Sequence, residues 1–205
     1  MKIAIDIDNT LLECKSNLYK LISTMEKFVP SHNSKPNFIA NDEKAKNVKV
    51  VRNVFGKIGN PDYYKEIDGA GDAINNFCSE GHTVDFLSSR PNVRILNNVV
   101  LSWLEKNKIN FDFMVVNCSD KAKFCEKYGV DLLIDDSMEK CKSTNDKGVS
   151  TILLDTKKKV DEENPKIKNR DKFYVAHSWK DAEKLARKVN DKIKEVEFDS
   201  IEMGL

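Results

Sequence analysis

Two aspartates, Asp6 and Asp8, follow the apolar run 3–5 near the start of the chain. Side chains at positions i and i+2 of a strand point the same way, so this spacing can direct both carboxylates into one small site at the strand's end. Two like charges are costly to bury together unless a cation or a proton offsets them. A divalent metal that prefers hard oxygen ligands, Mg²⁺ above all, is the simplest such cation. The pair therefore predicts an active site.

Three further groups of polar residues follow later apolar runs in the same way. In chain order they are Ser88-Ser89-Arg90 after the run 82–87, Lys121 and Lys123 after the run 111–116, and Asp135-Asp136 after the run 131–134. The carboxyl ends of parallel strands meet at one edge of a sheet, so we expect all of these groups to converge with the first aspartate pair. Together they would supply acids for a metal, a hydroxyl group, a cation and a nucleophile.

Strands and helices are predicted to alternate along most of the chain. Segments with apolar residues at helical spacing lie between the apolar runs, and the runs themselves are nearly continuous. This order is typical of a parallel sheet covered by helices on both faces, so the predicted fold class is α/β with a mostly parallel sheet. The predicted strands are 3–7, 82–87, 111–116, 131–134, 150–154 and 172–175, and the predicted helices are 68–80, 93–106, 120–128 and 178–196.

Residues 12–67 interrupt this alternation. A plain loop of this length would be unusual in a compact domain, and two stretches of helical pattern, 16–28 and 40–55, lie within it. We therefore predict that 12–67 form a small helical insertion above the strand ends, while 1–11 and 68–205 form the core. The alternative is an ordinary strand-to-helix crossover with a long loop.

The bulk composition excludes several classes of protein. The 205 residues are 40% hydrophobic and 33% charged, and 34 Lys and Arg against 33 Asp and Glu give a formal net charge of +1. This composition is typical of a soluble globular domain, and the charge balance offers no basic surface for nucleic acid. No stretch is apolar enough to cross a bilayer, and without a recognisable signal peptide we expect a cytoplasmic location. Monomer and homodimer both stay open.

The five cysteines are odd in number and include no C-x-x-C pair. They predict reduced thiols rather than a disulfide framework or a zinc site. The three histidines have no spacing that indicates metal binding, so we interpret them as ordinary polar residues.

The four polar groups, taken in order, resemble the motifs of the haloacid dehalogenase (HAD) superfamily of phosphohydrolases. The matching residues are Asp6-x-Asp8-x-Thr10 for the first motif, Phe86-Leu87-Ser88 for the second, Lys121 or Lys123 for the third, and Leu132-Leu133-Ile134-Asp135-Asp136 for the fourth. The first motif alone is a weak signal, whereas all four in order at strand ends are a strong one. The resemblance covers residues 1–156 and implies a HAD-like three-layer sandwich with a small helical cap inserted after the first strand.

This resemblance implies a division of labour between the residues of the first two motifs. Asp6 would be the nucleophile that forms an aspartyl-phosphate. Asp8 would protonate the leaving oxygen and then deprotonate the attacking water. Thr10 would help to place Asp8 and is a candidate for substrate contact, and Ser88 would hydrogen-bond the phosphoryl oxygens.

The resemblance also implies how charge is handled in the site. Lys121 or Lys123 would offset charge on the phosphate, and Lys121 fits better because it falls in the first turn of its helix. The ligands of Mg²⁺ would be the carboxylates of Asp6, Asp135 and Asp136 and the backbone carbonyl of Asp8. Of the acidic pair, Asp136 matches the usual metal ligand more closely. Each lysine has an alternative interpretation as a surface charge, and the acidic pair has one as a helix N-cap.

The insertion corresponds in position to the cap that HAD enzymes place over the site, which excludes water and reads the leaving group. Candidates for that reading are Arg52, Asn53, Phe55, Tyr63 and Tyr64. Arg52 could pair with an anionic group of the substrate, and an aromatic ring could stack on a nucleobase. Packing inside the cap is the alternative role for the aromatic residues.

Two segments resemble the 5′-nucleotidase and 5′(3′)-deoxyribonucleotidase branch of the superfamily. They are the run Ser88-Ser89-Arg90 and the segment 120–137, and His177-Ser178-Trp179 agrees with the same branch. The resemblance adds Ser89 and Arg90 to the candidates for phosphate or substrate binding, although Ser89 stands where a smaller residue is expected.

The leading hypothesis is a Mg²⁺-dependent phosphomonoesterase that acts on a small phosphorylated metabolite, with nucleoside monophosphates favoured. One alternative is a phosphatase for sugar phosphates or other small metabolites, which only the cap would distinguish. Another is a non-catalytic HAD-like domain that binds a phosphorylated ligand or a partner protein. The presence of both Asp6 and Asp8 argues against the last alternative, because a domain without activity needs neither carboxylate.

Overall fold

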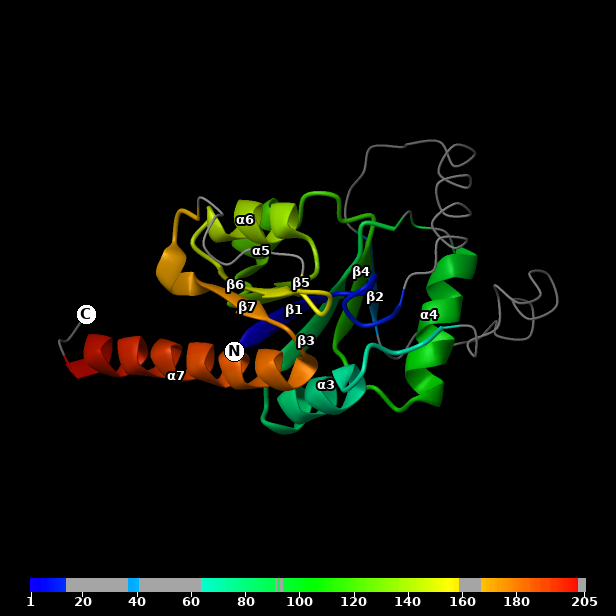
Figure 1. Ribbon diagram of the computed structural model, residues 1–205, viewed down its shortest axis with the longest axis horizontal. Coiled ribbons are helices and arrows are strands. Elements are labelled where there is room, and N and C mark those ends of the chain that lie inside the picture. The colour runs from blue at the N-terminus through cyan, green and yellow to red at the C-terminus, as the bar shows by residue number, and fades with distance from the viewer. Residues whose placement is uncertain (14–36, 41–63, 91, 93, 159–166, 203–205) are drawn as a thin grey trace.

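The computed structural model describes residues 1–13, 37–40, 64–90, 92, 94–158 and 167–202 (Figure 1). They form one seven-stranded sheet with the strand order β2-β4-β3-β1-β5-β6-β7. The strands are β1 (Lys2–Asp6), β2 (Asn37–Ala40), β3 (Thr83–Leu87), β4 (Phe113–Val116), β5 (Leu132–Asp135), β6 (Ser150–Leu154) and β7 (Phe173–Ala176). All neighbours pair in parallel except β2, which pairs antiparallel with β4 at the edge. The predicted α/β fold with a mostly parallel sheet is confirmed.

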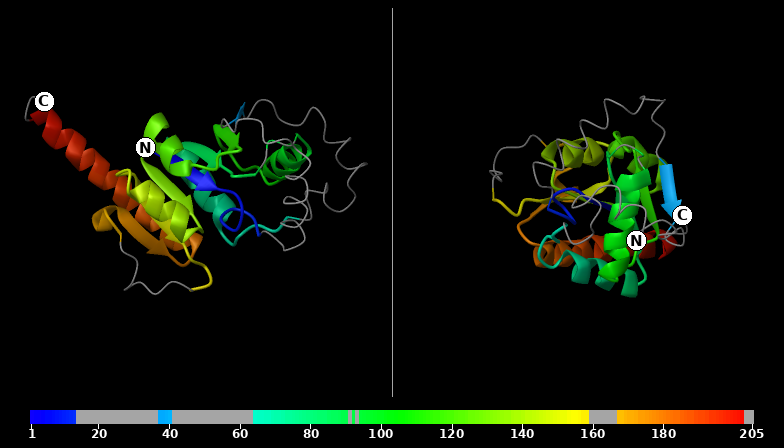
Figure 2. Two further views of the ribbon diagram at one scale, coloured as in Figure 1. Left: turned by 90° about the horizontal axis from the view of Figure 1, so that it is seen from above. Right: turned by 90° about the vertical axis from the view of Figure 1, so that its right-hand side faces the viewer.

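Helices cover both faces of the sheet, as the nearly continuous apolar strands predict. They are α3 (Ala70–Ser79), α4 (Arg94–Lys106), α5 (Lys121–Tyr128), α6 (Met138–Asn145) and α7 (Trp179–Glu202). In Figure 1, α5 and α6 lie on one side of the sheet, and α3 and α7 lie on the other. The C-terminal part of α7 extends beyond the sheet (Figure 2). Among the described residues, no helix is long and apolar enough to cross a membrane.

Three clusters of buried hydrophobic residues form the core of the described part of the chain: two larger ones on opposite faces of the sheet, and a smaller one of Cys141, Leu153 and Phe173. Successive side chains of a strand point to opposite faces, so Ile3 and Ile5 of β1 join one cluster and Ala4 joins the other. The cluster with the two isoleucines receives residues from α3, α4 and α7, whereas the cluster around Ala4 receives Phe124 and Cys125 from α5. This packing fixes β1 at the centre of the molecule, and with it the start of the candidate site.

The segment predicted as an insertion begins and ends beside the tip of β1. Leu12 forms an antiparallel bridge with Glu66, and the Ile67 amide donates a hydrogen bond to the Leu11 carbonyl at 2.9 Å. Within the segment, β2 joins the core sheet, a strand that the sequence does not predict. The helical stretch expected at 16–28 lies outside the described residues, and so does the stretch expected at 40–55 except for Ala40, which ends β2. The division into core and cap therefore stays a prediction.

Local sequence signals explain where the helices near the sheet's carboxyl edge begin and end. The Asp120 side chain caps the start of α5 by accepting a hydrogen bond from the Lys123 amide. The same helix ends at Gly129, whose φ of 62° is a left-handed conformation that glycine adopts at little cost. Ser137 caps α6 by accepting from the Lys140 amide. These caps set the first turns of α5 and α6 close to the strand ends.

Candidate active site

The end of β1 lies between the ends of β3 and β5, and strand register aligns the polar residues that follow. Ile5 pairs with Ile134 of β5, so Asp6 and Asp135 occupy matching positions at the ends of adjacent strands. On the other side Asp6 pairs with Leu87 of β3, which places Ser88 directly after this register position. The predicted convergence of the first, second and fourth groups at one sheet edge is thus a consequence of parallel pairing.

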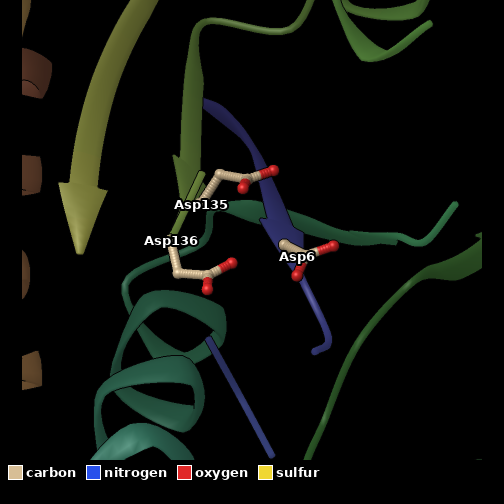
Figure 3. A group of neighbouring side chains, drawn as sticks. All are labelled: Asp6, Asp135 and Asp136. Atoms are coloured by element: carbon tan, nitrogen blue, oxygen red, sulfur yellow. The ribbon is translucent and has the colours of Figure 1, made fainter. Parts of the chain in front are cut away.

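Three carboxylates gather at this edge. Oxygen atoms of Asp6, Asp135 and Asp136 all lie within 4.8 Å of one another. Figure 3 shows the three side chains near one another at the ends of β1 and β5. Asp6 and Asp135 are buried, with 7% and 1% of their surface exposed. Like charges placed so closely away from water require compensating positive charge.

Lys121 supplies part of that charge. Its Nζ donates hydrogen bonds to Asp6 Oδ1 and, at 2.6 Å, to Asp135 Oδ2, and its side chain is 2% exposed. Lys121 is the first residue of α5, so the cap at Asp120 determines where its side chain starts. Lys123, the other candidate, is exposed. Residues two apart on a helix lie on different faces, so only Lys121 reaches the acidic cluster.

One lysine does not balance the negative charge of three carboxylates. The pKa values of two of these carboxylates are raised. Burial raises the pKa of Asp6 to about 8, with Lys121 opposing this shift and Asp135 adding to it. Burial and the Asp135 charge raise the pKa of Asp136 to about 6. Burial alone would lower the pKa of Lys121, but the charges of Asp6 and Asp135 outweigh it and the pKa is raised. Lys121 is therefore a cation in this site, and the three aspartates could bind a further cation.

The donor set at this edge fits Mg²⁺. The ion prefers hard oxygen ligands and is usually held by a few carboxylates together with waters and substrate phosphates. The cluster of Asp6, Asp135 and Asp136 offers carboxylate oxygens with neither sulfur nor imidazole among them. Asp135 is already oriented, because its Oδ1 accepts a hydrogen bond from the Ser137 amide at 2.8 Å while its Oδ2 accepts from Lys121.

Thr10 ties the loop after β1 to the loop after β5. Its hydroxyl accepts a hydrogen bond from the Asp136 amide at 3.0 Å, and its carbonyl accepts one from the indole Nε1 of Trp179 at 2.9 Å. Thr10 is fully buried, and Trp179 is the first residue of α7. The resemblance implies that Thr10 helps to place Asp8. In the structure, the Thr10 hydroxyl contacts the backbone amide of Asp136.

Asp8 lies against Arg90. Arg90 Nε donates to Asp8 Oδ2 at 2.7 Å, and Arg90 Nη2 donates to Asp8 Oδ1 at 2.5 Å. The loop that carries Asp8 turns at Asn9, whose φ is 59°, and is closed by hydrogen bonds from the Leu11 and Leu12 amides to the Ile7 carbonyl. The sequence predicts Arg90 as a substrate ligand but contains no signal for this pairing across 82 residues.

Ser88 is fully buried at the end of β3, and its Oγ accepts a hydrogen bond from the Arg90 amide at 3.2 Å. Ser89 is exposed, and its Oγ donates to the Cys118 carbonyl at 3.1 Å. Its role in substrate binding stays a prediction. Arg52 and Tyr63 lie outside the described residues, and their roles stay predictions. Tyr64, a cap candidate, is 5% exposed and belongs to the core cluster of α3, α4 and α7.

Solved structures share this architecture at low sequence identity. An uncharacterized protein from Listeria monocytogenes serotype 4b gives a TM-score of 0.59 at 12% identity, over 93% of this chain and 98% of that chain. A haloacid dehalogenase-like family hydrolase from Xanthomonas campestris gives 0.54 at 11% identity, over 95% and 97%. D,D-heptose 1,7-bisphosphate phosphatase from B. bronchiseptica, complexed with magnesium and phosphate, gives 0.51 at 10% identity, over 91% and 98%.

These likenesses show the fold. The chain has the α/β fold of HAD-superfamily hydrolases, as its four motifs predict. No family model matches the chain, and no curated protein sequence shows significant similarity to it. The nucleotidase branch stays a prediction that rests on the motifs.

Proposed function

We propose that this protein is a Mg²⁺-dependent phosphomonoester hydrolase that acts through an aspartyl-phosphate on Asp6. The observation that carries the proposal is the setting of Asp6, a buried carboxylate in contact with the Lys121 ammonium and within 4.8 Å of oxygens from two further aspartates. A phosphate monoester is anionic and repels an attacking carboxylate unless positive charge is arranged around both. This site places a lysine cation and two further potential metal ligands around Asp6.

In the proposed reaction, an oxygen of Asp6 attacks phosphorus and the bond from phosphorus to the leaving oxygen breaks. Asp8 donates a proton to that oxygen, which departs as an alcohol. Asp8, now a carboxylate, then accepts a proton from a water that attacks the phosphoryl group on Asp6. The bond from Asp6 to phosphorus breaks, inorganic phosphate leaves, and both aspartates return to their starting states.

The other residues of the site position charge and the phosphoryl group. Mg²⁺ bound by Asp6, Asp135 and Asp136 would neutralise charge on the phosphoryl oxygens. Lys121 would offset charge on Asp6 and on the incoming phosphate from the opposite direction. Ser88 stands at the strand end beside Asp6, where a hydroxyl could donate to a phosphoryl oxygen.

For the substrate, we favour nucleoside monophosphates among small phosphorylated metabolites. The support is the resemblance of Ser88-Ser89-Arg90 and the segment 120–137 to the nucleotidase branch. Sugar phosphates and other small esters are the competing class. A panel of nucleoside 5′- and 3′-monophosphates, sugar phosphates and phosphoglycolate, compared by kcat/KM, would separate the classes.

The first experiment uses p-nitrophenyl phosphate with Mg²⁺ or with EDTA. We expect release of phosphate only with the metal, and loss of turnover in Asp6→Asn, which keeps the size of the side chain but removes the nucleophile. Asp191→Asn, an exposed position on α7, serves as the control. Full activity in Asp6→Asn would contradict the proposal. Thermal stabilisation by phosphorylated ligands without turnover would favour a non-catalytic binding domain.

A further inference from the structure

The contact between Arg90 and Asp8 has the geometry of a bidentate pair. Nε and Nη2 of the guanidinium each donate to a different oxygen of the carboxylate, at 2.7 and 2.5 Å. The two side chains are 4% and 15% exposed, so water competes little with the pair. Two parallel charge-assisted hydrogen bonds fix the distance and the plane of the carboxylate together.

Arg90 is itself held by its surroundings. Its amide donates to Ser88 Oγ at 3.2 Å, and its carbonyl accepts from the Asn117 amide at 2.7 Å. At the other end of the side chain, the guanidinium carbon lies 5.9 Å from the centre of the Tyr64 ring. The backbone of Arg90 is therefore held by Ser88 and by the loop after β4, and its guanidinium lies beside a buried aromatic ring.

The pairing leaves part of the Asp8 carboxylate open. A carboxylate presents about four lone-pair sites on its two oxygens, and the guanidinium fork uses two of them. The remaining sites can face a leaving oxygen or a water while the fork stays in place. A single ammonium could satisfy the charge of Asp8 but would not define its plane, because lysine is a point donor on a flexible stem.

We propose that Arg90 is a positioning residue that orients the Asp8 carboxylate for proton transfer, rather than a ligand of the substrate phosphate. The role of Asp8 in this inference rests on the proposed function, whereas the orientation of Asp8 by Arg90 does not. Arg90→Lys is the informative variant, because it keeps the positive charge and removes the fork. Arg187→Lys is the control, since Arg187 also pairs with a carboxylate but on the exposed surface, where its Nε and Nη2 both donate to Glu80 Oε1.

The kinetic test compares two esters with different leaving groups. The alkoxide of β-glycerophosphate needs a proton to leave, whereas p-nitrophenolate does not. We expect Arg90→Lys to lower kcat/KM for β-glycerophosphate at least about tenfold more than for p-nitrophenyl phosphate, because general acid catalysis matters only for the first. Equal losses on both esters would overturn the proposal in favour of phosphate binding. In an Asp8→Asn background, Arg90→Lys should no longer distinguish the esters.

A structural test does not depend on turnover. Crystal structures of the wild type and of Arg90→Lys should show the Asp8 carboxylate in different orientations, while Arg187→Lys leaves it unchanged. An unmoved Asp8 in Arg90→Lys would overturn the positioning role whatever the activity. If the wild type hydrolyses neither ester with Mg²⁺, the proposed function fails, and the crystal comparison alone decides whether Arg90 orients Asp8.

Discussion

Lys121 donates a hydrogen bond to Asp135 across 2.6 Å in a setting where both side chains are only 2% exposed. The lysine begins α5 and the aspartate ends β5, so this ion pair joins a helix to the neighbouring strand at the level of Asp6. A buried ion pair contributes little to net stability when it is compared with apolar residues. Replacing one partner of the pair is nevertheless costly, because the buried charge of the other partner is then uncompensated.

Replacing Lys121 with methionine should therefore damage both stability and activity. Without metal, we expect Lys121→Met to lower the free energy of unfolding by about 3 kcal/mol, because Asp6 and Asp135 lose their buried cation. With Mg²⁺, kcat should fall by about 100-fold or more, the loss typical of one electrostatic contact to the reacting group. Urea unfolding and phosphatase assays measure the two effects.

Lys123→Met is the matched control for that experiment. Lys123 lies on the same helix but is exposed, and its backbone amide, which the substitution retains, makes the cap contact with Asp120. We expect its stability and kcat to stay within the range of ordinary surface substitutions. Similar losses in both variants would show that the positive charge of α5 matters, and not the contact of one lysine with the acidic cluster.

The hydrogen bond from the Asp136 amide to the Thr10 hydroxyl should control metal affinity. Thr10→Val keeps the shape of the side chain and removes the acceptor, so Asp136 loses the support of its backbone. We expect Mg²⁺ affinity to fall by about 10-fold or more, as it does when residues that orient metal ligands are changed. Thr10→Ser retains the hydroxyl and should bind Mg²⁺ as the wild type does. Calorimetric titration would decide, and equal affinities in the two variants would count against this role.

Mg²⁺ affinity should also rise with pH between about pH 5 and pH 8. The pKa values of Asp6 and Asp136 are raised to about 8 and about 6, so the metal-free native state keeps protons that the unfolded chain has released. Their contribution to the free energy of unfolding in EDTA should therefore decrease as pH rises through this window. Mg²⁺ needs the ionised carboxylates and displaces those protons on binding.

The difference in free energy of unfolding between the wild type and Asp136→Asn isolates the contribution of Asp136 from those of all other titrating groups. In EDTA, the variant should gain stability relative to the wild type as pH rises through the raised pKa of Asp136, about 6. Urea unfolding at pH 5, 6.5 and 8 measures this difference. A difference that stays constant with pH would contradict the raised pKa of Asp136.

Most of the sheet was predictable from the sequence, because buried parallel strands are nearly continuous apolar runs. The run 150–154 coincides with β6, and the run 82–87 differs from β3 by one residue at its start. The strand β2 was not predictable in the same way. A four-residue antiparallel strand at a sheet edge is too short to show a period, and its identity depends on pairing with β4.

The residue types of the site were predictable, but several of their contacts were not. The carboxyl ends of parallel strands lie at one edge of the sheet, so the strand pattern predicts that Asp6 and Asp135 share that edge. Their adjacency depends on the pairing of β1 with β5. The preference for Lys121 over Lys123 also followed from the position of a helix start. The partners of Asp8 and Thr10 come from residues that are distant in the sequence, and no local pattern indicates such contacts.

The hydrogen bond between Trp179 and Thr10 joins residues that are the furthest apart in the sequence among these contacts. From it we predict that the C-terminal helix supports metal binding. The Trp179 indole donates to the Thr10 carbonyl across 169 residues of chain. Trp179→Phe removes that donor and should cost at least about 1 kcal/mol of unfolding free energy. It should also weaken Mg²⁺ binding, because Thr10 in turn supports Asp136. Trp103→Phe is the control, since this buried indole also donates to a backbone carbonyl, that of Tyr64. Trp103→Phe should lower stability to a similar extent without weakening Mg²⁺ binding, and equal Mg²⁺ affinities in the two variants would rule out the route through Thr10.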